Sequence, residues 1–227
     1  MRRLFPLFLF VVLLVTSGVT HVSASGRVTP QLQRFSRTDY LMGVDFRIDL
    51  FARSEMDADR AFKAAFSRIT DLDQCMSNYR ADSELSLLCT NATKNQSIKV
   101  SEDLWAVLIY ANRISSLSNG AFDVTIGRVT KLWRRARRQQ ELPSEQRLAE
   151  ELEFVGFEKL ILNPVDQSVM IRTPGLLIDL GAIGKGYAAD EALKVLKDLG
   201  ITRAVVNASG DVRFGAPPPD SAGWPTG

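Results

Sequence analysis

The spacing of apolar residues predicts strands and helices along most of the chain. Over 40–52, apolar residues occupy every second position from Val44 to Leu50, which is the period of a strand with one buried face. A helix with Asp57 as its N-cap is expected to follow. Its apolar face would carry Ala61, Ala65, Ile69, Leu72 and Met76.

Further elements are predicted downstream. Turn-forming residues indicate a loop over 77–96, and Ser101 is expected to cap a helix that ends near Gly120. A polar helix is expected from Ser144 to Glu153. The elements predicted after it are strands at 159–162, 168–172 and 176–180, a helix at 186–199, and strands at 203–207 and 212–214. Hairpin-like strands combined with packed helices predict an α+β fold with mixed, largely antiparallel sheets.

Residues 1–24 have the layout of a secretory signal peptide. Arg2 and Arg3 precede an apolar run over 4–15, and Ala24 ends a stretch of small residues suited to cleavage. We therefore expect an exported, periplasmic protein, with a loose leader over 25–38 and one domain over 39–227. Retention of the segment as an anchor, which would associate the protein with the inner membrane, is the alternative.

The overall charge of the chain does not indicate binding to nucleic acid. The chain has 28 basic and 26 acidic residues, and removal of the signal peptide with its two arginines leaves it neutral. One basic cluster stands out locally. It consists of Lys131, Arg134, Arg135, Arg137 and Arg138. We interpret the cluster as the solvated end of a helix, with a functional basic patch as the alternative.

Several catalytic chemistries are excluded by the residue types of the mature chain. His21 is the only histidine and lies within the signal peptide, so Ser-His-Asp catalysis, Cys-His catalysis and His-ligated zinc are excluded. Cys75 and Cys89 either form a disulfide or remain two free thiols.

The stretch "IDLGAIGKGYAAD" carries the most unusual chemistry. Asp179 lies in an apolar run, where an ionised carboxylate needs a partner, either a local backbone amide or a ligand. Three glycines and Lys185 follow before the predicted helix. Backbone N–H groups at such a turn suit a phosphate, although the glycines could equally serve close packing. Tyr79, in "MSNY", either stacks on an aromatic ligand or fills an edge of the core.

Five motifs occur together in this chain. They are Met42-Gly43, "MSNY" followed by Ser83-Glu84, "GAFDVTIGRVTKLW", "IDLGAIGKGYAAD" and "VVNASGDVRFG". In this order they resemble the FAD:protein FMN transferases, the ApbE family, once described as thiamine-biosynthesis lipoproteins. The resemblance extends from about residue 36 to the end of the chain.

The resemblance implies a set of binding residues and a reaction. The residues that would contact FAD are Met42, Tyr79, Ala121, Phe122, Asp123, Asp179 and Lys185. The backbone carbonyl of Ala182 would bind a magnesium ion. The implied reaction transfers the FMN moiety of FAD to a Thr or Ser hydroxyl of an exported acceptor flavoprotein and releases AMP.

The chain also departs from the family pattern. Members usually continue past the last matched strand with further magnesium ligands, and many carry a lipoprotein cysteine that is missing near Ala24. We therefore expect a flavin transferase fold that is incomplete at the C-terminus, and no magnesium-dependent transfer by a chain that ends at Gly227. A non-catalytic remnant that binds a flavin nucleotide is the alternative.

The signal-peptide interpretation predicts that the exported protein begins at Ser25. The mass of the N-terminal peptide, measured on protein recovered from the periplasm, tests this. Recovery of an intact Met1 from that compartment would contradict it.

Overall fold

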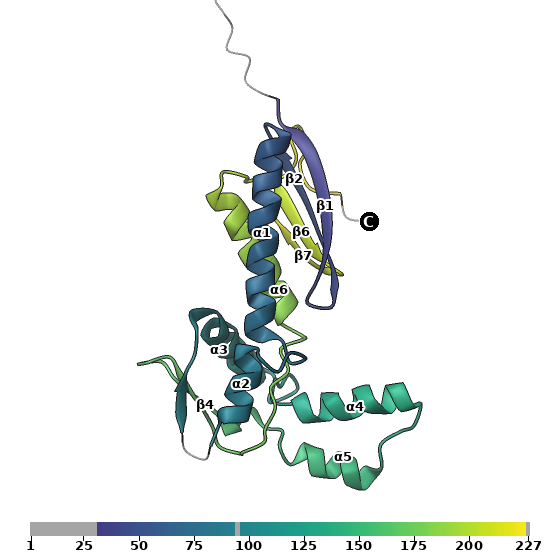
Figure 1. Cartoon of the computed structure of the whole chain (residues 1–227), viewed down its shortest axis with the longest axis vertical. Coiled ribbons are helices and arrows are strands. Elements are labelled where there is room, and N and C mark those ends of the chain that lie inside the picture. Colours follow the sequence, from purple (N-terminus) through teal and green to yellow (C-terminus); the bar gives the residue numbers. More distant parts are fainter. Residues whose placement is uncertain (1–30, 94–95, 226–227) are drawn as a thin grey trace, which may run out of the picture. The chain divides into compact units, whose positions relative to one another are not determined.

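An antiparallel sheet in the order β1-β2-β6-β7 forms one half of the described structure (Figure 1). The computed structural model describes residues 31–93 and 96–225. The strands are β1 (Gln33–Leu41), β2 (Val44–Ala52), β6 (Ala204–Ala208) and β7 (Asp211–Phe214). On β2, the side chains of Phe46, Ile48 and Leu50 are completely buried, which confirms the predicted alternation.

The predicted strand over 40–52 is broken by a hairpin turn. Met42 and Gly43 both adopt positive φ angles, 52° and 79°, and Leu41 pairs with Val44 across the turn. Two consecutive residues with positive φ form the tight turn whose twist suits a two-residue hairpin. The turn places Met42 beyond the ends of both strands.

The expected loose leader over 25–38 is wrong for its last six residues. Residues 33–38 belong to β1, which pairs with β2 along its whole length from Gln33 to Leu41. Only Phe35 packs against the core in this part of β1, so the segment lacks the apolar alternation that marks a strand. Its backbone hydrogen bonds to β2, which composition does not reveal, fix it as an edge strand.

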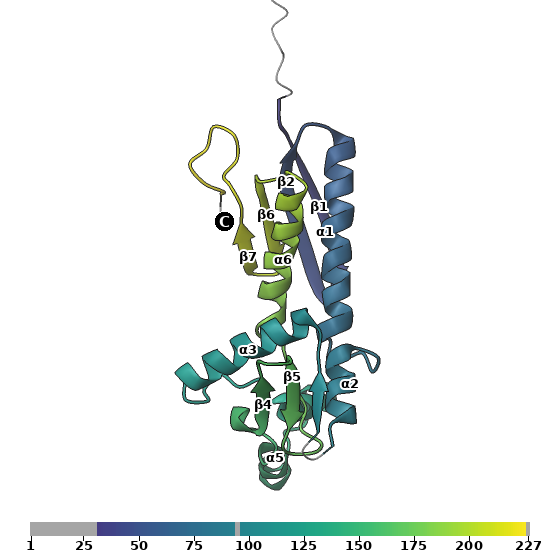
Figure 2. The same cartoon turned by 90° about the vertical axis from the view of Figure 1, so that its left-hand side faces the viewer.

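Two long helices pack side by side against this sheet (Figure 2). They are α1 (Glu55–Met76) and α6 (Gly184–Asp198). The predicted apolar face of α1 is buried, as are Ala188, Ala192 and Leu196 on α6. Ser54, not Asp57, is the N-cap of α1, because its hydroxyl accepts the Asp57 N–H at 3.1 Å.

A second antiparallel sheet and further helices form the other half. The strands, in the order β3-β5-β4, are β3 (Ser97–Lys99), β5 (Ser168–Ile171) and β4 (Leu160–Asn163). The helices are α2 (Glu84–Asn91), α3 (Glu102–Leu117), α4 (Gly127–Gln139), α5 (Glu145–Leu152) and the 3-10 turn η1 (Phe157–Lys159). The α+β class with largely antiparallel sheets is thus confirmed, and Ser101 and Ser144 cap α3 and α5 as predicted.

Two predicted elements differ from the structure. The loop expected over 77–96 contains α2, and its N-cap, Ser83, is completely buried. The helix is too short for the periodicity of its apolar residues to predict it. The run over 176–180 is not a strand of either sheet. Its apolar side chains fill the core, but its only strand-type pairing within the described residues is the bridge from Leu177 to Ile126.

The predicted signal peptide and residues 25–30 of the leader lie outside the described residues. Within 31–93 and 96–225, no helix combines the length and apolar character needed to cross a bilayer.

A close backbone contact fixes the start of α4. The Gly127 N–H donates to the Leu177 carbonyl at 3.0 Å, and a Cβ atom on Gly127 would lie 2.6 Å from that oxygen. Because backbone rather than a flexible side chain blocks the space, only glycine fits without displacing the chain. This contact holds α4 against the segment that carries Asp179.

We predict that Gly127→Ala lowers the free energy of unfolding by about 1–3 kcal/mol, because the added methyl group collides with the Leu177 carbonyl. Gly186→Ala is the matched control, since a Cβ there meets open space within a helix. It should raise stability by about 0.5–1 kcal/mol. Urea unfolding measures both, and equal stability of the two variants would contradict the close contact.

Candidate functional site

A cleft of about 580 Å³ lies where α4, α6, the β1–β2 turn and the end of α1 meet. The residues that line it are Tyr40, Met42, Gly43, Val44, Asp73, Met76, Ser77, Asn78, Tyr79, Arg80, Arg134, Asp179, Leu180, Gly181, Gly184 and Lys185. The volume lies within the range of small-molecule sites. Met42, Tyr79, Asp179 and Lys185, predicted as binding residues, are thus brought together from distant parts of the chain.

Asp179 lines the cleft and is buried, with 9% of its surface exposed. Its Oδ2 accepts a hydrogen bond from Arg134 Nη2 at 2.9 Å, and its Oδ1 accepts the Gly181 N–H at 2.9 Å. The Asp179 N–H donates to the Val124 carbonyl at 2.7 Å. The carboxylate therefore has a local backbone amide as a partner, which is one of the two alternatives predicted for it. It also has an arginine partner that the sequence did not identify.

Arg134 joins Asp179 to Tyr79. Its guanidinium carbon lies 4.3 Å from the centroid of the Tyr79 ring, and Nη1 donates to Asn78 Oδ1 at 3.3 Å. Tyr79 is 78% exposed, so it does not fill an edge of the core, and its ring can stack on a ligand. For Arg134, the interpretation of the basic cluster as a solvated helix end is wrong, because the side chain forms a wall of the cleft.

The N-terminus of α6 opens on the cleft. No side chain caps its first turn, and Gly184 and Lys185 line the cleft. Lys185 Nζ lies 2.6 Å from Asp211 Oδ2. A Cβ on Gly184 would meet the Met42 methyl at 3.6 Å, so the hairpin turn packs closely on this helix end. The Gly184 N–H already donates to the Leu180 carbonyl at 2.7 Å. The next N–H groups of the first turn, the helix dipole and a lysine together suit an anionic group.

The segment 121–123 lies away from the lining of this cleft. Asp123 Oδ1 accepts hydrogen bonds from the Thr125 N–H at 2.8 Å and the Thr125 hydroxyl at 2.7 Å. Phe122 packs against the core and Ala121 is exposed. The predicted contact of these residues with FAD stays a prediction.

The predicted metal ligand, Ala182, is exposed in the turn before α6. Within the described residues, no group of three or more Asp, Glu, Cys or His side chains is placed to hold a metal ion. Magnesium prefers near-octahedral oxygen ligation, so one main-chain carbonyl does not make a site. The described residues do not fit a resident magnesium ion by themselves.

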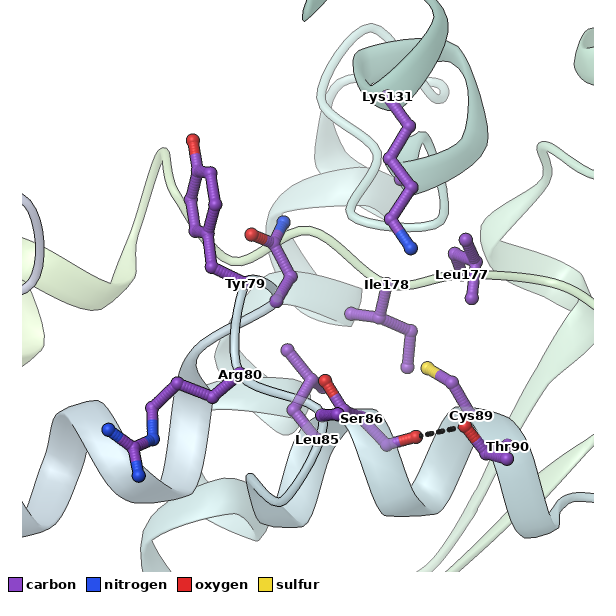
Figure 3. Close-up of a pocket in the computed structure, with 12 residues that line it drawn as sticks. Tyr79, Arg80, Leu85, Ser86, Cys89, Thr90, Lys131, Leu177 and Ile178 are labelled. Atoms are coloured by element: carbon purple, nitrogen blue, oxygen red, sulfur yellow. Dashed lines mark hydrogen bonds between the residues drawn. The ribbon is translucent and has the colours of Figure 1, made fainter.

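A second cavity, of about 240 Å³, adjoins the cleft and shares Asn78, Tyr79 and Arg80 with it. Figure 3 shows Lys131 reaching from α4 towards Cys89 and Ile178. Burial raises the pKa of the Cys89 thiol, which disfavours the reactive thiolate.

Cys75 and Cys89 are free thiols in the structure, so of the two predicted alternatives, a disulfide or two free thiols, it supports the second. Cys75 lies apart from Cys89, where its sulfur donates to Glu84 Oε2 at 3.3 Å. Burial, with a smaller contribution from the Glu84 charge, raises the pKa of the Cys75 thiol to about 12. Neither thiol is suited to nucleophilic catalysis at neutral pH.

A model of the ApbE family matches residues 42–227. The FAD:protein FMN transferase of Haemophilus influenzae is 32% identical over 149 residues, covering 64% of this chain and 43% of that protein. Its counterpart in Klebsiella pneumoniae is 29% identical over 178 residues, covering 78% and 55%. The chain therefore spans about half the length of the curated relatives it matches.

Solved structures share the fold. The flavin transferase ApbE of Vibrio cholerae superposes with a TM-score of 0.77 at 24% identity, covering 86% of this chain and 63% of that chain. The ApbE protein of Thermotoga maritima gives 0.72 at 26% identity, covering 82% and 60%. The predicted fold of the flavin transferases is thereby confirmed.

We predict that Asp179 and Arg134 are energetically coupled. Arg134→Met should lower the free energy of unfolding by about 1–3 kcal/mol, because a buried carboxylate loses its cation. Asp179→Asn together with Arg134→Met should cost less than the two single changes added, by about 1–2 kcal/mol. Arg135→Met, at an exposed neighbour, should change stability by no more than about 0.5 kcal/mol.

Urea unfolding of Arg134→Met, Asp179→Asn, the double variant and Arg135→Met, each compared with wild type, measures this coupling as a double-mutant cycle. Additive losses in the double variant would show that the pair contributes no coupling, and would contradict its role in the cleft wall.

Proposed function

The chain belongs to the ApbE family, and from this premise we propose that its function is to bind FAD and transfer the FMN moiety to an acceptor flavoprotein. The described residues, which include no cluster of metal-ligating side chains, are expected by themselves to bind the nucleotide without completing the transfer. The observation that carries the proposal is the cleft, whose lining joins Met42, Tyr79, Asp179 and Lys185. These are residues that the family resemblance assigns to FAD. Their meeting in one cleft is expected of a nucleotide site.

The diphosphate of FAD is placed at the N-terminus of α6. The uncapped first turn supplies N–H groups, and Lys185 supplies a positive charge beside it. The ion pair of Lys185 with Asp211 is part-exposed, so a diphosphate can compete for the ammonium group.

One of the two ring systems of FAD stacks on the exposed ring of Tyr79. Arg134 supports that ring from the side of Asp179, because it contacts both residues. Met42, in the hairpin turn, provides an apolar contact on the α6 side of the cleft.

The reaction is a phosphoryl transfer onto a hydroxyl. The Thr or Ser oxygen of the acceptor attacks the phosphorus on the FMN side, and the bond from that phosphorus to the bridging oxygen breaks. AMP leaves with the bridging oxygen, and the hydroxyl proton is released to water. The protein contributes mainly by positioning and by neutralising charge, which is how most phosphoryl transfer is catalysed.

Magnesium dependence is part of the proposal by family resemblance. A divalent ion would neutralise charge on the diphosphate. The resemblance assigns the Ala182 carbonyl as a ligand, and the described residues add no cluster of metal-ligating side chains to it. FAD titrations with magnesium and with a chelator test whether this chain binds the ion together with the nucleotide.

The acceptor is proposed to be an exported flavoprotein with a Thr- or Ser-containing flavinylation site. This follows from the signal-peptide prediction, which places the protein in the periplasm, with the inner membrane as the alternative location. Nucleic acid is not a proposed partner.

A second candidate function is binding of a flavin nucleotide without transfer. The observation in its favour is that the described residues form the cleft but contain no cluster of side chains placed to hold a metal ion. Incubation with FAD, magnesium and a threonine-containing acceptor domain distinguishes the two, because only transfer adds the FMN mass to the acceptor.

We predict that Asp179→Ala weakens FAD binding about ten- to a hundredfold, whereas Asp123→Ala has a much smaller effect. Asp179 lines the cleft, and its loss removes the charge-assisted hydrogen bond to the nucleotide that the family resemblance implies, worth about 1.5–3 kcal/mol. Asp123 bonds to Thr125 outside the cleft lining. Quenching of FAD fluorescence during titration measures both affinities.

Circular dichroism and urea unfolding establish that each variant is folded at the temperature of the titration. Equal FAD affinity for wild type and Asp179→Ala would count decisively against the nucleotide cleft.

A further inference from the structure

One face of α4 carries a row of basic residues that we call the basic stripe. It consists of Lys131, Arg134, Arg135 and Arg138. Their spacing of three, four and seven residues places them on the same side of a helix. The opposite side carries Val129 and Ala136, which are buried, so the stripe is not the face by which α4 packs.

The charge of the stripe is mostly uncompensated within the described residues. Arg134 pairs with Asp179, whereas Lys131, Arg135 and Arg138 take part in no ion pair there. The neighbouring helix α5 runs beside α4 (Figure 1) but does not neutralise the stripe. Its Glu150 and Glu151 pair with Arg147 and Arg128, which lie outside the stripe.

A solvated helix end does not account for the whole stripe. Cations in the last turn are favoured by the helix dipole, and this suffices for Arg137 and Arg138. Lys131 and Arg134 lie nearer the N-terminus of α4, where the dipole gives them no such support. The pair with Asp179 accounts for Arg134. Lys131 and Arg135 have neither an ion pair within the described residues nor a place in the last turn, so their positive charge needs a different reason.

The inner end of the stripe reaches the nucleotide cleft. Arg134 forms its wall beside Tyr79, and Lys131 reaches into the adjoining cavity (Figure 3). The outer end, with Arg135 and Arg138, is exposed. A polypeptide lying along α4 would thus pass from solvent directly to the cleft.

We propose that the basic stripe is a docking surface for an acidic segment of the acceptor protein, and this rests on the proposed function. The acceptor hydroxyl must reach the phosphorus in the cleft, and α4 is a wall of that cleft. The chain as a whole is nearly neutral, so the stripe attracts locally acidic chains without a general affinity for polyanions. Complementary charges of this kind chiefly raise association rates and select partners.

The test uses the 227-residue chain and two fluorescein-labelled peptides. One peptide has a central threonine flanked by aspartates, and the other has asparagines in their place. Fluorescence anisotropy at low and high salt measures binding to wild type and to Arg135→Gln/Arg138→Gln. The control is Arg53→Gln/Arg172→Gln, which removes two exposed arginines outside α4 and changes the net charge equally.

The proposal predicts that wild type prefers the aspartate peptide and that the preference falls at high salt. The Arg135→Gln/Arg138→Gln variant should lose about tenfold in affinity for it, and the control should lose little. Equal losses in the two variants, or equal affinity of wild type for the two peptides, would overturn the proposal.

Two further arms keep the outcomes separate. Sedimentation with vesicles that contain phosphatidylglycerol tests whether the stripe binds anionic lipid, and the stripe should not cause the wild-type chain to sediment with them. If the wild-type chain sediments with the vesicles, binds neither peptide, and no longer sediments after Arg135→Gln/Arg138→Gln, the stripe is a lipid-binding surface and the proposal is overturned.

FAD titrations on the same samples should give equal affinities for all variants. Failure of wild type to bind FAD would refute the proposed function, and with it the identity of the partner as an FMN acceptor, even if the aspartate peptide binds.

Discussion

The buried ion pair of Asp179 with Arg134 is the interaction on which the candidate site depends. A carboxylate with little exposed surface is costly unless a cation and hydrogen-bond donors compensate it, and Arg134 and the Gly181 N–H do so. The pair fixes α4 against the segment before α6, and the contact of Gly127 with Leu177 does the same at the start of α4. One wall of the cleft, and the position of the basic stripe, therefore depend on the Asp179–Arg134 pair together with this backbone contact.

The opposite wall depends on backbone geometry rather than on charge. The hairpin turn at Met42 and Gly43 directs the Met42 side chain to the glycine at the start of α6, where a Cβ on Gly184 would lie 3.6 Å from the Met42 methyl. The first turn of α6 has no side-chain cap and lines the cleft beside this contact. Charge on one side and free N–H groups on the other suit a ligand with aromatic rings and a diphosphate.

Local patterns in the sequence predict much of the fold. The alternation on β2, the apolar face of α1 and the caps at Ser101 and Ser144 are all local signals. Asp179 was identifiable because a carboxylate in an apolar run is unusual, but its partner was not, since no local signal selects Arg134 from 28 basic residues. The edge strand over 33–38 was missed because backbone pairing holds it.

A crystal structure of the chain with FAD tests the central claim most directly, namely that the cleft beside the Asp179–Arg134 pair is the nucleotide site. The account predicts the diphosphate at the first turn of α6 beside Lys185, one ring system on Tyr79, and the ion pair intact. FAD bound outside this cleft, or an Arg134 that has left Asp179 to make room for the nucleotide, would contradict it.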